Sequence, residues 1–91
     1  MYSKRYLFVG DALEAMPELK KYFPNSVFMQ MATDNILGLK VDYVVILIKW
    51  TAHSMYYKVK DELTLKNILI INVNTKNINR VLLEMYKGIM I

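Results

Sequence analysis

The sequence contains no cysteine, and it has only one histidine and one tryptophan among its 91 residues. The lack of cysteine excludes a disulfide framework, a thiolate metal site and a thiol nucleophile. No apolar run approaches the ~20 residues that a membrane-spanning helix needs. The first residues lead into a strand rather than into the apolar region of a signal peptide. We therefore expect a cytoplasmic protein with no membrane partner.

Glycine is scarce as well, with three residues in all. Gly10 stands alone after an apolar segment, so neither the dinucleotide fingerprint nor the P-loop spacing is present. With one histidine, no cysteine and no acidic residue near that histidine in sequence, a metal site also lacks ligands. We expect no cofactor and no bound metal ion.

Charge is modest, since twelve basic and eight acidic residues leave a net charge of +4. The basic residues are scattered, which is typical of a solvated surface and leaves a mild attraction for anionic ligands. Neither a basic helix nor a helix-turn-helix pattern is present, so we expect no binding to double-stranded DNA.

Hydrophobic residues are plentiful, at 55% of the chain. The length indicates a single domain, 1–91, whose small core cannot cover that much apolar surface. In the final helical pattern, Leu83 and Tyr86 widen the apolar face beyond what one sheet needs. We therefore expect a homo-oligomer, with a dimer as the default.

Strands and helices alternate along the chain. Apolar β-rich runs predict strands at 4–9, 26–31, 42–48 and 68–73, of which 42–48 and 68–73 have the pattern of strands buried on both faces. Helical periodicity predicts one helix beginning near Pro17, a second over 55–66, and a third capped by Asn74-Thr75. Residues 32–40 fit either a short helix or an ordered loop.

This alternation predicts an α/β fold, a flavodoxin-like or Rossmann-like three-layer sandwich around a four-stranded parallel sheet in the order 2-1-3-4. The turns at 10–11 and 49–54 then meet at the switch point between the first and third strands. Such sheets bind their ligands at that point. Asn74 and Thr75 lie along the same edge.

The segment 42–60 (DYVVILIKWTAHSMYYKVK) carries a strand, a polar turn with His53-Ser54, and a lysine-containing helix. This segment resembles the small bacterial Rossmann-like domains of domain-of-unknown-function family 2325. The opening run 7–11 is similar to the first turn of that family, with a single glycine, and the run 68–74 is similar to its last strand. The resemblance implies a Rossmann-like fold with its site around His53, and no defined chemistry.

His53 is the main candidate for a functional residue. It lies at or just before a predicted helix N-terminus, where the helix dipole disfavours a charged imidazole. A neutral imidazole can donate a hydrogen bond, act as a general base or bind a metal. Alternatively, His53 caps the helix or packs against Tyr56 or Tyr57.

The residues around His53 have two interpretations. Thr51 and Ser54 are natural helix caps, yet hydroxyls and free N–H groups at a helix N-terminus also bind anions, with Lys49 as the countercharge. Trp50 fits a core position, a lid or an interface anchor. The candidate ligand-binding residues are Gly10, Asp11, Lys49, Trp50, Thr51, His53, Ser54, Asn74 and Thr75.

Three functions remain open from the sequence. The first is a homodimeric module that binds a small anionic molecule, such as a nucleotide, around His53. The second is a small metal-independent phosphodiesterase that acts on a nucleotide signal, similar to a ring nuclease, with His53, Ser54 and Lys49 as candidate catalytic residues. The third is an inhibitor or adaptor that binds another protein.

Overall fold

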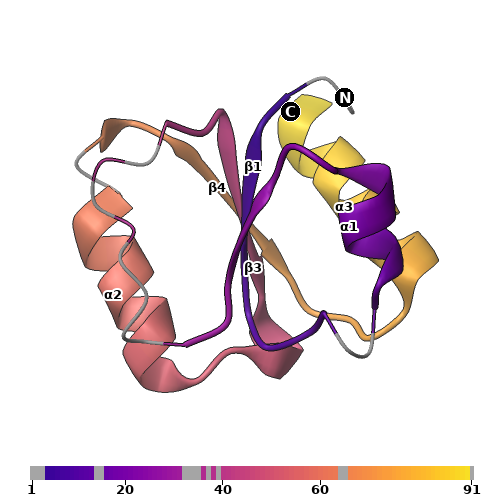
Figure 1. Cartoon of the computed structure of the whole chain (residues 1–91), viewed down its shortest axis with the longest axis horizontal. Coiled ribbons are helices and arrows are strands. Elements are labelled where there is room, and N and C mark those ends of the chain that lie inside the picture. Colours follow the sequence, from indigo (N-terminus) through magenta and orange to yellow (C-terminus); the bar gives the residue numbers. More distant parts are fainter. Residues whose placement is uncertain are drawn as a thin grey trace.

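A central parallel sheet lies between helices on both of its faces (Figure 1). The computed structural model describes residues 4–13, 16–31, 36, 38, 40–63 and 66–90. Strands β1 (Tyr6–Val9), β2 (Val27–Met29), β3 (Tyr43–Leu47) and β4 (Leu69–Val73) pair in the order β2-β1-β3-β4. This confirms the predicted fold class and strand order.

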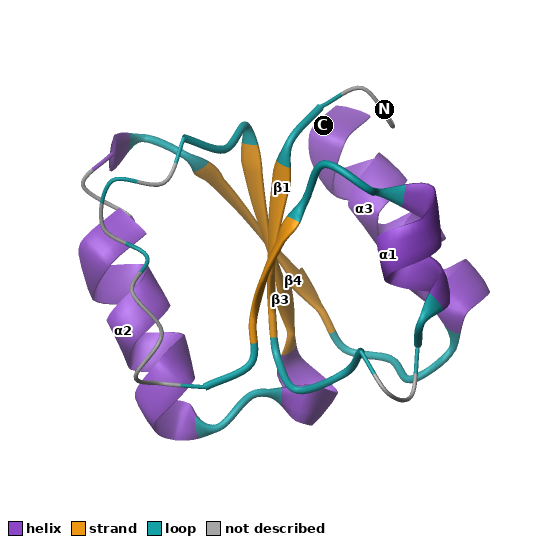
Figure 2. Ribbon diagram, viewed as in Figure 1, coloured by secondary structure: helices purple, strands orange, loops and turns teal. Residues whose placement is uncertain are grey.

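The helices divide between the two faces of the sheet (Figure 2). Helix α1 (Glu18–Tyr22) and helix α3 (Ile78–Met90) cover one face, and helix α2 (His53–Leu63) covers the other. A 3₁₀ turn, η1 (Ile48–Trp50), joins β3 to the connection before α2. Helix α1 begins at Glu18, so it starts near Pro17 as predicted, but Pro17 is the N-cap and not the first helical residue that its fixed φ favours.

Two hydrophobic clusters form the core, one on each face. Side chains of a strand alternate between the faces, so β1 contributes Tyr6 and Phe8 to one cluster and Leu7 and Val9 to the other. On the first face an aromatic group of Tyr6, Phe8 and Phe23 packs under α1 and α3. On the second, buried residues of α2 (Met55, Val59 and Leu63) pack on β1 and β3.

The structure corrects two predicted boundaries around η1. The strand prediction extended to residue 48, but Ile48 belongs to η1 and is exposed. The helix predicted from Met55 begins two residues earlier, at His53. A tight 3₁₀ turn shortens the connection, so the helix starts sooner than the apolar periodicity indicates.

Two further predictions are wrong, and one lies mostly outside the described residues. β4 is an edge strand with Leu69 and Asn72 exposed, not a strand buried on both faces. The cap of α3 is Asn77, whose Oδ1 accepts hydrogen bonds from the N–H groups of Asn79 (2.9 Å) and Arg80 (3.3 Å), rather than Asn74-Thr75. Within 32–40, residues 32–35, 37 and 39 are not described.

Candidate functional site

The turns that follow β1 and β3 touch each other at the carboxyl end of the sheet, as predicted. The Asp11 N–H donates to the Trp50 carbonyl at 3.1 Å. Gly10 has a φ of +135°, and a Cβ added to it would lie 3.1 Å from Thr51 Oγ1 and 3.2 Å from the Leu47 carbonyl oxygen. Only glycine fits this approach without strain.

The Thr51 hydroxyl ties these turns together. Its Oγ1 lies 2.7 Å from the carbonyl oxygen of Leu47 and 3.1 Å from that of Val9, and its one proton serves both acceptors. Thr51 therefore links the end of β1 to the end of β3. Its side-chain proton is engaged in the scaffold, although the residue also lines the pocket described next.

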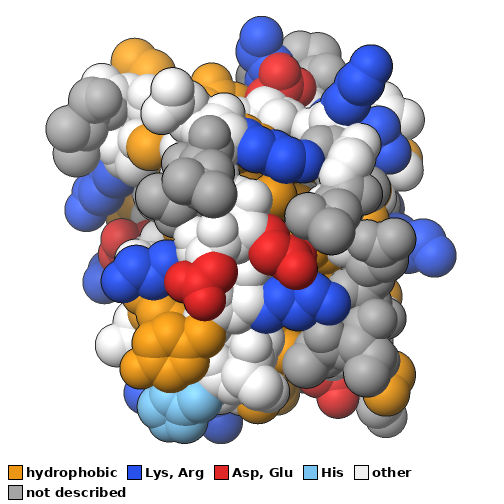
Figure 3. Space-filling model, turned by 90° about the vertical axis from the view of Figure 1, so that its left-hand side faces the viewer, with side chains coloured by type: hydrophobic (Ala, Val, Ile, Leu, Met, Phe, Trp, Pro, Cys, Tyr) orange, Lys and Arg blue, Asp and Glu red, His pale blue; other side chains and the backbone are white. Residues whose placement is uncertain are grey.

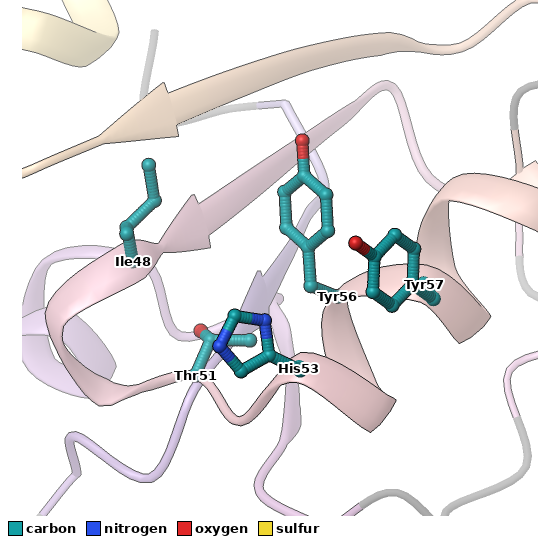
Figure 4. A pocket seen from close by; sticks show the side chains of 5 residues that line it. All are labelled: Ile48, Thr51, His53, Tyr56 and Tyr57. Atoms are coloured by element: carbon teal, nitrogen blue, oxygen red, sulfur yellow. The ribbon is translucent and has the colours of Figure 1, made fainter.

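A pocket of about 310 Å³ opens at the start of α2 (Figure 4). Its lining residues are Ile48, Thr51, His53, Tyr56 and Tyr57. The His53 ring stacks on the Tyr57 ring with centroids 6.5 Å apart and an interplanar angle of 24°. Tyr57 meets Tyr56 edge to face at 5.7 Å. His53 therefore packs against a neighbouring tyrosine, which is one of the alternatives to ligand binding that the sequence left open.

Helix α2 presents free backbone donors beside this pocket. The Tyr56 N–H is bonded to the Ala52 carbonyl at 3.0 Å, which leaves the N–H groups of His53, Ser54 and Met55 without acceptors inside the helix. Ala52 precedes the helix and has no side-chain oxygen to cap them. Exposed His53 and Ser54 flank this first turn, and Figure 3 shows the histidine beside a hydrophobic patch at one end of the α2 face.

The structure places Trp50 on the opposite face from His53. Trp50 packs against the cluster beneath α1 and α3, and Lys76 Nζ lies 5.2 Å from the centroid of its ring. Its buried Nε1 has no hydrogen-bond partner among the described residues. The indole and the imidazole, three residues apart in sequence, therefore do not share a pocket.

Other predicted site residues also lie outside the His53 pocket. Exposed Asp11 lines a separate hollow of about 520 Å³ with Phe28, Gln30 and Met31. Thr75 Oγ1 accepts from the Asn77 N–H at 3.2 Å in the turn before α3, and Asn74 is exposed. Lys49 is exposed in η1, directly after Ile48.

Sequence reasoning did not assign Ile48, Tyr56 and Tyr57 to the ligand site. The signal was present in the spacing, because residues 53, 56, 57 and 60 follow i, i+3, i+4 and i+7 and share one side of a helix. That side became recognisable only once the helix was known to begin at His53.

The pocket has the chemistry of a binding site for a flat ligand with a negative group. Its aromatic rings offer a stacking surface, and the helix N-terminus offers N–H donors. No described residue that lines it is acidic. Across the described ranges, no three His, Cys, Asp or Glu side chains are grouped to hold a metal ion. No helix within them is both long and apolar enough to span a membrane.

Comparisons of the chain with protein-family models, with curated proteins and with solved structures find no match.

Proposed function

We propose that the protein is a cytoplasmic, homodimeric module that binds a small anionic ligand of the nucleotide class at the carboxyl edge of its sheet. The observation that carries this proposal is the pocket in which His53, Tyr56 and Tyr57 adjoin the uncapped first turn of α2. A base stacks on the tyrosine rings in this arrangement, and a phosphate accepts hydrogen bonds from the helix N–H groups.

The size of the pocket favours a mononucleotide. Its volume of about 310 Å³ lies at the lower end of the ~300–1,000 Å³ range of ligand sites. The single Gly10 turn supplies no glycine-rich loop for a pyrophosphate. Exposed Lys49 adds positive charge close to Ile48, which lines the pocket.

Thermal unfolding with a panel of ribonucleoside monophosphates, and with inorganic phosphate alone, tests this proposal. A ligand at 100 times its Kd should add about 2.7 kcal/mol of stability. In a domain of this size that raises Tm by roughly 10 °C or more. Tyr57→Ala should lower the affinity about tenfold, because base–aromatic stacking contributes roughly 1–3 kcal/mol.

The matched control is Tyr22→Ala on α1, because Tyr22 is another exposed tyrosine, at 40% against 57% for Tyr57, and lies on the other face of the sheet. The control should bind as the wild type does. A panel in which no compound raises Tm, or a Tyr57→Ala protein that binds unchanged, would contradict the proposal.

Catalysis by the same pocket is the alternative, because exposed His53 shares it with Thr51. The phosphodiesterase hypothesis assigns acid–base chemistry to His53, positioning of the phosphate to Thr51 or Ser54, and stabilisation of its charge to Lys49. Chromatography of a cyclic dinucleotide incubated with the protein separates the two functions. Hydrolysis that is lost in His53→Ala, with binding retained, would establish the enzyme.

Membership of domain-of-unknown-function family 2325 stays a prediction.

A further inference from the structure

Strand β4 is an unprotected edge of the sheet. It is five residues long (Leu-Ile-Ile-Asn-Val) and contains neither a charged residue nor a proline. Proteins usually blunt such edges with short strands, charges or proline. The opposite edge, β2, is three residues long and so is protected by its shortness. Among the residues that the structure describes, no strand pairs with the free edge of β4.

A groove runs between this edge and α2. Because α2 packs mainly on β1 and β3, the α2-side face of β4 is left partly open, with Ile70 half-buried and Asn72 exposed. A hollow of about 240 Å³ lies here, and a second of about 440 Å³ adjoins it at Ile70. We call their combined lining the β4 groove: Ile46, Tyr56, Lys60, Asn67, Ile68, Leu69, Ile70 and Asn72.

The groove has apolar walls with basic residues beside them. Tyr56 forms one wall and points from α2 toward β4 (Figure 4). Lys60 Nζ lies 5.9 Å from the centroid of the Tyr56 ring. Leu69, at the start of the strand, is 45% exposed and alternates with Ile70, so it faces the other side of the sheet. No described residue that lines the groove is acidic.

Two basic residues lie beside this groove. Lys60 and Lys66 are both exposed, in α2 and shortly before β4. An approaching acidic segment is attracted to these two lysines.

We infer that β4 is a docking edge for an extended acidic segment of a partner protein. The segment adds a strand beside β4 through main-chain hydrogen bonds, and its side chains alternate between the α2 side, where the β4 groove lies, and the other face of the sheet. Its acidic side chains face the α2 side and lie near Lys60 and Lys66, and its apolar side chains lie on the other face, beside exposed Leu69. A second copy of this chain is a poorer occupant, because it would bring the same lysines together.

A blocked peptide of four Glu-Val repeats is a direct probe, with NMR amide shifts of the full chain as the readout. The peptide should bind saturably and should shift the amides of residues 68–73 most. A Lys-Val peptide of the same length keeps the strand propensity and reverses the charge, and it should bind at least fivefold more weakly. Two further Glu-Val peptides test the main-chain hydrogen bonds separately from charge. One is N-methylated at every Glu and the other at every Val. The peptide whose methyl groups replace the N–H groups that face β4 should not bind.

Charge-reversal variants complete the test. Lys60→Glu should weaken binding of the Glu-Val peptide about fivefold and strengthen binding of the Lys-Val peptide, as expected for an exposed charge pair. Lys87→Glu is the matched control, because it reverses the same charge at an exposed position on α3. It should leave the affinities for both peptides unchanged.

Three results would overturn the inference. The first is equal affinity for the Glu-Val and Lys-Val peptides. The second is equal affinity for the unmethylated Glu-Val peptide and both of its N-methylated forms. The third is self-association of the peptide-free chain that protects the β4 amides, which would assign the edge to a second copy. None of these results depends on nucleotide binding, so this inference and the proposed function succeed or fail separately.

Discussion

Gly10 is the residue that lets the ends of β1 and β3 approach each other. Its φ of +135° is a conformation that residues with a Cβ rarely adopt, and the Trp50 Cβ lies 3.2 Å from where a Gly10 Cβ would be. The Thr51 hydroxyl closes the same contact by bonding to the carbonyls of Val9 and Leu47. Crowding and backbone conformation therefore act together at this position.

Gly10→Ala should lower the free energy of unfolding by roughly 2–3 kcal/mol, because the strained φ and the close contacts both oppose a Cβ. Urea denaturation measures the loss. Gly38→Ala is the control, because Gly38 has a φ of +82° but, apart from its chain neighbours, no atom of the described residues lies within 4 Å of an added Cβ. That change should cost about 1 kcal/mol. Equal losses in the two variants would show that crowding at Gly10 is unimportant.

At the scale of the element, the start of α3 shows how a turn selects its own cap. Three polar residues, Asn74, Thr75 and Asn77, could each cap a helix in this stretch. Thr75 Oγ1 accepts from the Asn77 N–H, and this turn directs Asn77 Oδ1 to the N–H groups of the first helical turn. The choice among the three residues depends on the path by which the chain leaves β4.

Asn77→Ala should destabilise the protein by about 1 kcal/mol, since two N–H groups of α3 lose their acceptor. Thermal unfolding followed by circular dichroism measures the change. Asn74→Ala, at an exposed position outside the helix, should stay within about 0.5 kcal/mol of the wild type. A larger loss in Asn74→Ala than in Asn77→Ala would restore the cap predicted from sequence.

At the scale of the whole molecule, apolar surface remains on the outside of α3. Leu83, Tyr86 and Met90 are large exposed side chains at i, i+3 and i+7, so they form one stripe along the helix. Tyr86 and Met90 also border a cavity of about 220 Å³ between the end of α3 and the start of β1 and β3. This stripe is the surface we assign to the proposed homodimer.

Tyr86→Lys should weaken dimerisation at least tenfold, because a charge would be buried where an aromatic anchor packs. Sedimentation equilibrium at several protein concentrations measures the association. Tyr57→Lys makes the same change at a similarly exposed tyrosine of α2 and should leave the dimer intact. A wild-type protein that is monomeric at high concentration, or equal effects of the two substitutions, would contradict this assignment.

Local pattern in the sequence determined the order of the elements, the parallel sheet and the position of His53 at the head of a helix. Apolar period and short connections are properties of neighbouring residues, and they leave few topologies for a chain of alternating strands and helices. The contact of the turns at Gly10 and Thr51 followed from that topology.

Tertiary structure alone decided which residues share a surface. Trp50 and His53 lie on opposite faces of the sheet because residues 51–52, between η1 and α2, carry the chain from one face to the other. The Thr51 hydroxyl donates to the carbonyl of Val9, 42 residues away in sequence. Strand β4 lies at the edge of the sheet, and its apolar sequence alone did not reveal that α2 leaves part of it uncovered. Such features depend on packing between segments that are distant in sequence, and the spacing of apolar residues along the chain carries no information about that packing.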